Sequence, residues 1–203
     1  MRIGLTGGIA SGKSFVLRTF AELGAVTFSA DEAARAILAP QGSVLKAIAQ
    51  TFGASVLYPD GSLNRNLLAQ SIFKDATLRE KLNSLTHPPL LRLLAAQIES
   101  VYYELAPQVP VIVEIPLLYE VGLESWFDQV VVVYATPAEQ VERLCKRNKL
   151  SRREAEARLL AQMPLEEKRA RADIVLENHS DEISLTRATQ RLWRQFSSTR
   201  ERR

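Results

Sequence analysis

The sequence has few residues of the kinds that form cross-links or bind transition metals. Its 203 residues include one cysteine, Cys145, and two histidines, His87 and His179. A single cysteine excludes an internal disulfide and any zinc site built from several cysteines. An apolar run of about 18 residues, the length of a membrane-spanning helix, is also missing, and so is a secretory signal pattern. We therefore expect a cytoplasmic protein that does not bind membranes.

The opposite charges nearly balance, because 26 lysines and arginines stand against 23 aspartates and glutamates, for a net charge of +3. The hydrophobic content of 46% is ordinary for a globular domain. Much of the basic excess lies near the C-terminus, at Arg187, Arg191, Arg194, Arg200, Arg202 and Arg203. Such a tail can bind nucleic acid, or it can be the solvated face of a last helix. We expect the helix face and no nucleic-acid partner; the oligomeric state stays open.

The N-terminus carries the pattern G-x-x-x-x-G-K-[ST], which is typical of a phosphate-binding loop. This phosphate loop consists of Gly7, Gly8, Ile9, Ala10, Ser11, Gly12, Lys13 and Ser14. The apolar run 3–5 predicts a buried strand before the loop, and Phe15 begins an apolar helical pattern after it. The motif needs this strand–loop–helix context, and both flanks are present.

The residue types of the phosphate loop suit the binding of a nucleoside triphosphate. Glycine allows backbone angles that other residues avoid, so the chain can approach a phosphate closely. The amides of the loop and of the following helix start then form an anion site. We expect Lys13 to contact the β- and γ-phosphates of the nucleotide, Ser14 to ligate Mg²⁺, and Phe15 to border the nucleotide.

Four more apolar segments predict strands, at 25–28, 109–115, 130–134 and 173–176. Helical patterns alternate with them, among them 137–148, 151–162 and 181–196, and capping boxes at Thr136 and Ser151 begin the first two. Five near-continuous apolar strands that alternate with helices predict an α/β fold, a P-loop-type doubly wound five-stranded parallel sheet.

A long helical insertion interrupts this alternation. Residues 31–106 show helical patterns with breaks at 40–43, 58–62 and 87–89, and no strand is evident among them. We therefore expect a nucleotide-binding core, a helical acceptor lobe and a helical lid. The core comprises residues 1–29, 109–148 and 173–203, the acceptor lobe 30–108, and the lid 149–172.

Three classes of phosphate-loop protein remain for this chain: a GTPase, an ATPase motor or regulator, and a small-molecule kinase. A GTPase needs Asn-Lys-x-Asp, but the nearest match, 148–151, ends in serine. An ATPase motor or regulator usually has an acidic strand end with more carboxylates than Glu114 alone. A small-molecule kinase needs a helical acceptor lobe, an acid near the acceptor hydroxyl and a basic lid, and all three occur here in order. The basic residues in and around the lid are Arg143, Lys146, Arg147, Lys149, Arg152, Arg153 and Arg158.

The chain resembles the dephospho-coenzyme A kinase family from residue 2 to about residue 180. The phosphate loop is shared by many families, whereas the order of the other segments is specific. The likeness rests on Gly4-Leu-Thr-Gly-Gly-Ile-Ala-Ser-Gly-Lys-Ser14, Ala30-Asp-Glu-Ala-Ala-Arg35, Asp60-Gly-Ser-Leu-Asn-Arg65, Leu85-Thr-His-Pro88, Ile115-Pro-Leu-Leu-Tyr-Glu120 and residues 162–173. The resemblance implies transfer of the ATP γ-phosphate to the ribose 3′-hydroxyl of dephospho-coenzyme A. This reaction is the last step of coenzyme A biosynthesis.

The candidate catalytic residues are Asp31, Lys13 and Arg147. Asp31 follows the second strand and so faces the same sheet edge as the phosphate loop, where a carboxylate can act as general base toward a hydroxyl. Ligation of Mg²⁺ through water, or stabilisation of a helix N-terminus, are its alternative roles. We expect Arg147, at the junction of helix and lid, to contact the transferring phosphate; a solvated helix face is the alternative for the lid arginines.

The resemblance further implies an acceptor site formed by Thr6, Asp31, Arg65, His87, Leu117 and Leu118. The alternatives to the roles that the resemblance implies are that His87 braces a loop and that Arg65 is a surface residue at a helix start. The family commonly has a second aspartate where this chain has Ser29, threonine in place of Phe15, and often aspartate in place of Tyr134. A kinase for another nucleoside or nucleotide, and a nucleotide-switched binding protein without catalysis, are the alternative functions.

Overall fold

The computed structural model describes residues 1–73, 75–105, 109–179 and 181–198. The predicted tail residues Arg200, Arg202 and Arg203 therefore lie outside the described residues. The chain divides into two compact units. The sheet unit comprises Met1–Ser29 and Val101–Arg203, and the helical unit comprises Ala30–Ser100.

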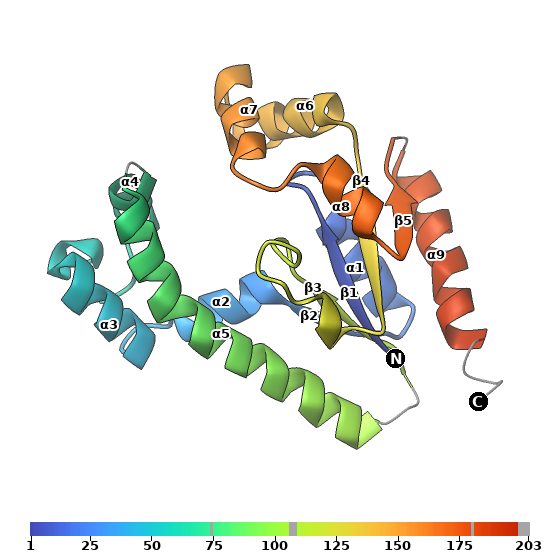
Figure 1. Cartoon of the computed structure of the whole chain (residues 1–203), viewed down its shortest axis with the longest axis horizontal. Helices are drawn as coiled ribbons and strands as arrows, with labels where there is room; N and C mark the ends of the chain where they lie inside the picture. The colour runs from blue at the N-terminus through green and yellow to red at the C-terminus, as the bar shows by residue number, and fades with distance from the viewer. Residues whose placement is uncertain (74, 106–108, 180, 199–203) are drawn as a thin grey trace. The chain divides into compact units, whose positions relative to one another are not determined.

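The sheet unit is built on five parallel strands in the order β2-β3-β1-β4-β5 (Figure 1). These strands are β1 (Arg2–Gly7), β2 (Val26–Ser29), β3 (Val111–Glu114), β4 (Gln129–Tyr134) and β5 (Ile174–Glu177). Their valine and isoleucine content favours strands, and helices packed on both faces keep the central strands buried. The predicted α/β fold with a five-stranded parallel sheet is confirmed, with strand ends shifted by one or two residues.

Five α-helices and one short 3₁₀ helix of the sheet unit are described. They are α1 (Lys13–Glu22), η2 (Glu124–Trp126), α6 (Pro137–Asn148), α7 (Arg152–Leu160), α8 (Leu165–Arg171) and α9 (Glu182–Ser198). The predicted capping boxes at Thr136 and Ser151 are present and begin α6 and α7. Val141, Leu144 and Ala155 pack these two helices together, with Cys145 partly buried beside them. Cys145 therefore contributes to packing.

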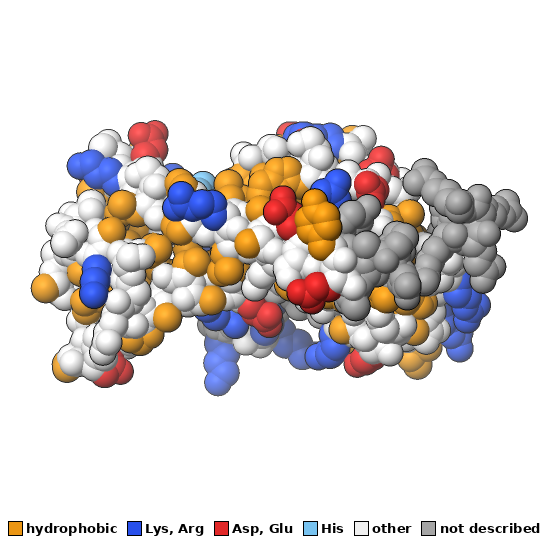
Figure 2. All heavy atoms as spheres, turned by 90° about the horizontal axis from the view of Figure 1, so that it is seen from below, with side chains coloured by type: hydrophobic (Ala, Val, Ile, Leu, Met, Phe, Trp, Pro, Cys, Tyr) orange, Lys and Arg blue, Asp and Glu red, His pale blue; other side chains and the backbone are white. Residues whose placement is uncertain are grey.

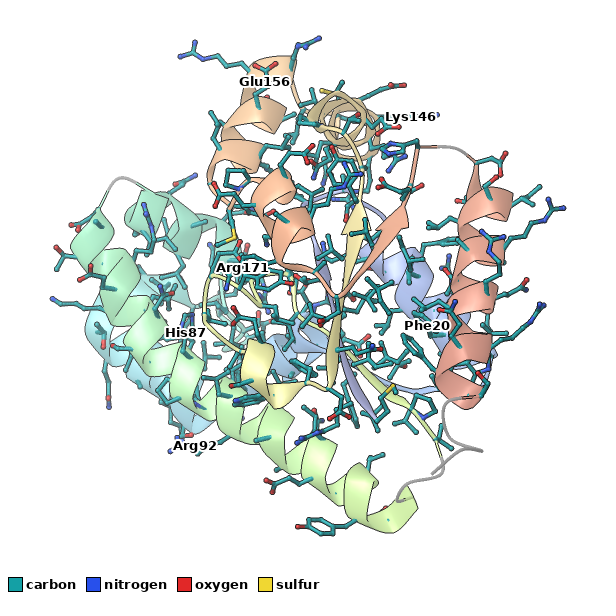
Figure 3. All side chains as sticks on the ribbon, turned by 45° about the vertical axis from the view of Figure 1, so that its right-hand side comes forward. Phe20, His87, Arg92, Lys146, Glu156 and Arg171 are labelled. Carbon is teal, nitrogen blue, oxygen red and sulfur yellow. The ribbon has the colours of Figure 1, made fainter. Side chains whose placement is uncertain are left out.

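One face of the sheet is covered by α1 and α9. Phe20 of α1 points toward α9, where its ring centroid lies 6.1 Å from that of Phe196 and 6.4 Å from that of Trp193 (Figure 3). Ile3 and Leu5 of β1 are fully buried in the same cluster. Burying several such side chains contributes roughly 2 kcal/mol each, so this layer fixes β1 and the loop that follows it.

The helical unit has its own small core. Its elements are α2 (Ala30–Ile37), α3 (Ser43–Phe52), η1 (Ala54–Val56), α4 (Arg65–Phe73) and most of α5 (Ala76–Leu105). Ile48, Val56 and Leu68 form its buried centre. The predicted breaks at 40–43 and 58–62 are confirmed. At the second, the backbone amide of Tyr58 donates to the Ser62 carbonyl at 2.8 Å and closes the turn.

The predicted break at 87–89 is wrong, because α5 continues through Pro88 and Pro89. Each proline lacks an amide hydrogen and costs a helix interior about 3 kcal/mol. Packing on both sides offsets this cost. Leu82 and Leu85 precede the pair and pack against the core of the helical unit, and Leu94, which follows it, is buried.

The surface of the described residues shows no dominant charged face in the view of Figure 2. Lysine and arginine side chains stand there singly or in small groups between hydrophobic and neutral ones. Within the described ranges, no helix is both long enough and apolar enough to cross a membrane.

Candidate active site

The phosphate loop connects β1 to α1, as its motif predicts, and its conformation needs glycine at two positions. Gly7 and Gly12 have φ angles of +152° and +103°. A Cβ atom on Gly12 would lie 2.4 Å from Nδ2 of Asn178, and one on Gly7 would lie 2.4 Å from the carbonyl oxygen of Val133. The backbone angle disfavours a side chain at both positions, and at Gly7 the nearby backbone leaves no space for one.

Lys13 and Ser14 begin α1, and each makes a defined contact. Lys13 is 8% exposed, and its Nζ donates to the carbonyl oxygen of Gly8 at 2.8 Å, so the positive charge lies along the loop. The Ser14 hydroxyl donates to Oε1 of Glu114 at 3.1 Å. Glu114 is the last residue of β3 and is 4% exposed. A hydroxyl and a carboxylate thus meet beside the phosphate loop.

Side chains from distant segments bind the backbone of the phosphate loop from outside. Nδ2 of Asn178, just after β5, donates to the Ser11 carbonyl at 2.7 Å. Nη2 of Arg143 donates to the Asn178 carbonyl at 2.8 Å, which links α6 to the same loop. Two glutamines, Gln140 of α6 and Gln162 of the turn between α7 and α8, bind Ile9. Sequence reasoning named Arg143 only among the basic residues in and around the lid, and it assigned no site role to Gln140, Gln162 or Asn178, although Asn178 directly follows a strand at the edge where ligands bind.

A fully buried lysine holds α8 to the segment after β3. Nζ of Lys168 lies 2.7 Å from Oε1 of Glu120 and donates to the carbonyl of Pro116 at 2.8 Å. The same Glu120 oxygen accepts from the amide of Met163 at 3.2 Å. At the other end of α8, the Arg171 guanidinium lies 4.4 Å from the centre of the Tyr119 ring (Figure 3). Burial raises the pKa of Tyr119 to about 12, although Arg171 opposes this shift.

A charged cluster lies at the carboxyl ends of β4 and β5. His179 Nδ1 is 3.0 Å from Glu139 Oε2, and its Nε2 is 2.8 Å from Glu177 Oε2. The hydrogen bond with Glu139 is the largest effect on His179 and raises its pKa. Partial burial acts to raise the pKa of Glu139, but hydrogen bonds from His179 and Thr136 outweigh it and lower the pKa to about 2. Tyr134 donates to Glu166, and this bond raises the pKa of Tyr134.

Three residues predicted in the acceptor site belong to the sheet unit, and two of them have no exposed surface. Thr6 is fully buried, and its hydroxyl donates to the Pro116 carbonyl at 3.3 Å. Leu118 is fully buried against Gly4. Leu117 is 40% exposed. Of the three, only Leu117 has exposed surface, whereas Thr6 and Leu118 hold the segment after β3 in place.

Two further predicted residues lie on helices of the sheet unit. The Phe15 ring packs at the edge of the core, with the Arg18 guanidinium 5.5 Å from its centre. Arg147 is exposed at the end of α6, where its Nε donates to Oδ1 of Asn148 at 2.9 Å. The structure does not bring Arg147 onto the phosphate loop. Arg143, one turn earlier in α6, does reach it, with Nη1 3.5 Å from the Ala10 carbonyl.

The remaining predicted residues lie in the helical unit. The chain passes from Ser29, the last residue of β2, directly into α2, so that Asp31 and Glu32 stand exposed in the first turn. Arg65 is exposed at the start of α4. His87 is half-buried on α5, within the continuous helix (Figure 3). Ser29 is the register partner of Glu114, so the chain enters α2 from the strand beside the Ser14–Glu114 pair.

A hydrophobic pocket of about 280 Å³ adjoins the phosphate loop within the sheet unit. Gly8 lines it together with Leu159, Met163 and Leu165. Tyr134 and Glu166 contribute polar groups to its lining. The phosphate loop therefore lies beside an apolar cavity that the segment around α7 and α8 helps to form.

A phosphate loop that follows the central strand of a five-stranded parallel sheet, with a carboxylate beside its serine, defines a P-loop kinase. A family model described as dephospho-CoA kinase matches residues 1–184. The chain belongs to the dephospho-CoA kinase family, a family of ATP-using kinases, and is an enzyme of the last step of coenzyme A biosynthesis.

Similar proteins agree with this assignment. A dephospho-CoA kinase from Geobacter sulfurreducens is 42% identical over 192 residues, which cover 94% of this chain and 96% of that protein. The solved dephospho-CoA kinase from Campylobacter jejuni has a TM-score of 0.74 and 27% identity, with 98% of each chain covered. Shikimate kinase from Acinetobacter baumannii, at a TM-score of 0.53 and 15% identity, covers 98% of this chain and 93% of its own, and shares the fold.

Proposed function

We propose that the chain transfers the γ-phosphate of ATP to the ribose 3′-hydroxyl of dephospho-coenzyme A, with Mg²⁺ held by Ser14 and Glu114. The observation that carries the proposal is the 3.1 Å hydrogen bond between these two side chains. Ser14 directly follows Lys13 in the phosphate loop. In this reaction the bond between the γ-phosphorus and its bridging oxygen breaks. A bond from the 3′-oxygen forms, and ADP leaves.

The donors beside the phosphate loop fit Mg²⁺ better than they fit a transition metal. Mg²⁺ takes oxygen ligands, keeps several waters and uses one or two carboxylates together with substrate phosphates. A serine hydroxyl and one carboxylate match that set. No cluster of three or more histidine, cysteine or acidic side chains suited to a metal occurs among the described residues. When bound, Mg²⁺ neutralises charge on the phosphates.

Lys13 and the loop amides supply the rest of the positive field. Transfer of a phosphoryl group depends mainly on positioning and on neutralising the oxygens around the phosphorus. The Lys13 amine is buried and lies along the loop at Gly8, so it can turn to a phosphate with a short movement of a flexible side chain. Its charge then adds to that of the amides at the start of α1.

We assign the general base to Asp31. One residue, Ala30, separates it from Ser29, the register partner of Glu114 in β3. Asp31 thus follows the carboxyl end of a parallel strand, and ligands of such sheets bind at that edge, which supports the assignment. A ribose hydroxyl is a weak nucleophile, and a carboxylate that accepts its proton also orients its oxygen for in-line attack.

An assay with alternative acceptors tests the proposed reaction. Production of ADP is measured with dephospho-coenzyme A, with a nucleoside monophosphate and with no acceptor, and the product is located by phosphorus NMR. We expect turnover with dephospho-coenzyme A and a new phosphate on the 3′-oxygen. Transfer to the monophosphate alone would overturn the assigned acceptor, and ADP release without acceptor would indicate a nucleotide switch.

Glu32 offers a matched control for Asp31, because both stand in the first turn of α2. Asp31→Asn should lower kcat about 10²-fold or more while the affinity for Mg²⁺–ATP stays nearly intact. Glu32→Gln makes the same change of charge at the same helix end and should leave kcat close to that of the parent. Equal small losses in both variants would assign Asp31 to the helix dipole, and a loss restored by added Mg²⁺ would assign it to the metal.

A further inference from the structure

Both backbone polar groups of Ile9, in the phosphate loop, are bound by glutamine side chains from distant parts of the sequence. The amide of Ile9 donates to Oε1 of Gln162 at 2.9 Å. Its carbonyl accepts from Nε2 of Gln140 at 2.6 Å. An amide can only donate and a carbonyl can only accept, so the backbone itself sets the orientation of both side-chain amides.

Gln140 is a fixed part of this arrangement. It is 3% exposed, and its backbone amide donates to the Thr136 carbonyl at 3.0 Å in the first turn of α6. A Cβ atom on Gly8 would lie 2.2 Å from Nε2 of Gln140. The missing side chain at position 8 therefore makes room for Gln140, and the two positions depend on each other.

Gln162 belongs to a different kind of segment. It lies in the turn that joins α7 to α8, within the predicted lid, and is partly exposed. Its neighbour Met163 is held by Glu120, whose carboxylate also pairs with buried Lys168. The Gln162 side chain thus joins the Ile9 amide to the turn between α7 and α8. That turn is itself bound to Glu120, in the segment after β3, through the Met163 amide.

The residue after Ile9 shows why such support matters. Ala10 has a φ angle of +58°, a left-handed conformation that costs a residue with a side chain roughly 1–2 kcal/mol. Such conformations persist where the surroundings impose them. Gln140 and Gln162 bind the chain on one side of Ala10, and Asn178 binds the Ser11 carbonyl on the other. The loop shape is therefore imposed from outside the loop.

We infer that Gln162 is a positioning residue, which through the Ile9 amide holds the phosphate loop in the shape that receives phosphate and joins that loop to the lid. The inference rests on the proposed use of the loop for the phosphates of ATP. Gln162 itself touches no reacting atom. It acts through Ile9 on the position of the phosphate-loop amides and of Lys13, which follow Ile9 in the sequence.

Exchange of the Ile9 amide hydrogen in nucleotide-free protein measures the contact directly. Gln162→Leu has a similar size but no acceptor, and it should speed exchange at Ile9 roughly three- to tenfold, as expected for the loss of one hydrogen bond. Gln162→Glu keeps an acceptor oxygen and should restore slow exchange. Gln140→Glu replaces the amide that donates to the Ile9 carbonyl with a carboxylate, which can only accept. It should therefore speed exchange of the Ile9 amide, although the change from glutamine to glutamate is the same as in Gln162→Glu.

Kinetics then test whether the contact matters for the reaction. Gln162→Leu should lower kcat/KM for ATP roughly three- to tenfold with KM for dephospho-coenzyme A unchanged. Gln97→Leu is the matched control, because Gln97 is partly exposed on α5, like Gln162, and this variant should behave like the parent. If Gln162→Leu fails to fold, Gln162→Asn is one methylene shorter and should give the same exchange result.

Two results would overturn the inference. One is an Ile9 amide that exchanges equally slowly in Gln162→Leu and in the parent. The other is faster exchange with unchanged kcat/KM for ATP, because the contact would then exist without positioning the loop. Failure of the parent protein to phosphorylate dephospho-coenzyme A would count against the proposed acceptor and would leave the exchange result standing.

Discussion

The amine of Lys168 lies 2.7 Å from Glu120 Oε1, yet the two side chains differ in exposure: that of Lys168 is fully buried, and that of Glu120 is 21% exposed. Removing one partner of a buried pair leaves an uncompensated charge, and the cost depends on which charge remains. Glu120→Gln leaves the buried amine and should lower the free energy of unfolding by about 3 kcal/mol or more. Lys168→Met leaves a carboxylate that water can reach and should cost about 1–2 kcal/mol.

Urea unfolding of both variants measures this asymmetry. Glu156→Gln is the control, since Arg152 and Glu156 form a pair of similar length, 2.8 Å, on the exposed faces of α7 (Figure 3). The loss there should stay below about 1 kcal/mol. A larger loss from Lys168→Met than from Glu120→Gln would contradict the assignment of the buried charge.

His179 predicts a dependence of stability on pH. Both ring nitrogens face carboxylates, of Glu139 and Glu177, so both can donate only when the ring is protonated. The pKa of His179 is raised above 6.5 in the folded state. Its stabilisation is therefore complete below the unfolded pKa and is lost as the pH rises through the folded pKa.

Urea midpoints at about pH 6 and pH 8.5 check this prediction. The parent should lose stability between the two, and His179→Gln should lose less. His87→Gln keeps the His179 contacts and should show the parental difference. An unchanged difference in His179→Gln would show that other groups titrate in this range.

The Ser14–Glu114 pair predicts a metal dependence. Ser14→Ala removes one proposed ligand of Mg²⁺ and should lower turnover at low magnesium, with partial recovery as the magnesium concentration rises. Lys13→Ala removes a charge that acts on phosphate, so its loss of kcat should persist at any magnesium concentration. Titration of both variants with Mg²⁺ separates the two effects. No recovery of Ser14→Ala would remove the serine from the metal site.

Two arginines of α6 allow a direct comparison. If Arg147 contacts the transferring phosphate, Arg147→Ala should lower kcat and kcat/KM alike. Arg143 binds the Ala10 and Asn178 carbonyls, so Arg143→Ala should instead weaken ATP binding and raise KM for ATP. Steady-state kinetics with ATP varied distinguish the two patterns. A change confined to KM in Arg147→Ala would mark a ground-state contact.

Local signals in the sequence were enough to predict the sheet and the helix starts. Near-continuous valine runs such as that of β4, and the capping boxes at Thr136 and Ser151, specify their elements through neighbouring residues. The proline pair in α5 misled the same reasoning. Proline marks a helix end from local chemistry alone, whereas Leu82 and Leu85, just before the prolines, pack against a core that is distant in sequence, and this packing supports the continuous helix.

The candidate site shows the same limit. The phosphate loop could be predicted because its residues are adjacent in sequence and because its backbone angles require glycine at Gly7 and Gly12. Gln140, Gln162 and Asn178 bind that loop from 131 or more residues away, and their contacts depend on strand order and helix placement. No local sequence pattern distinguishes a glutamine that binds a distant loop from a glutamine on the surface of a helix, so sequence reasoning could not identify these contacts.

The strand order has a consequence for synthesis on the ribosome. The neighbours of β1 in the sheet are β3 and β4, which end at Glu114 and Tyr134. At about 5–20 residues per second, on the order of ten seconds separate translation of the phosphate loop from translation of the strands that flank it. During that interval the nascent N-terminus has no sheet to join. The phosphate loop thus acquires its shape only after both strands that flank β1 have been made.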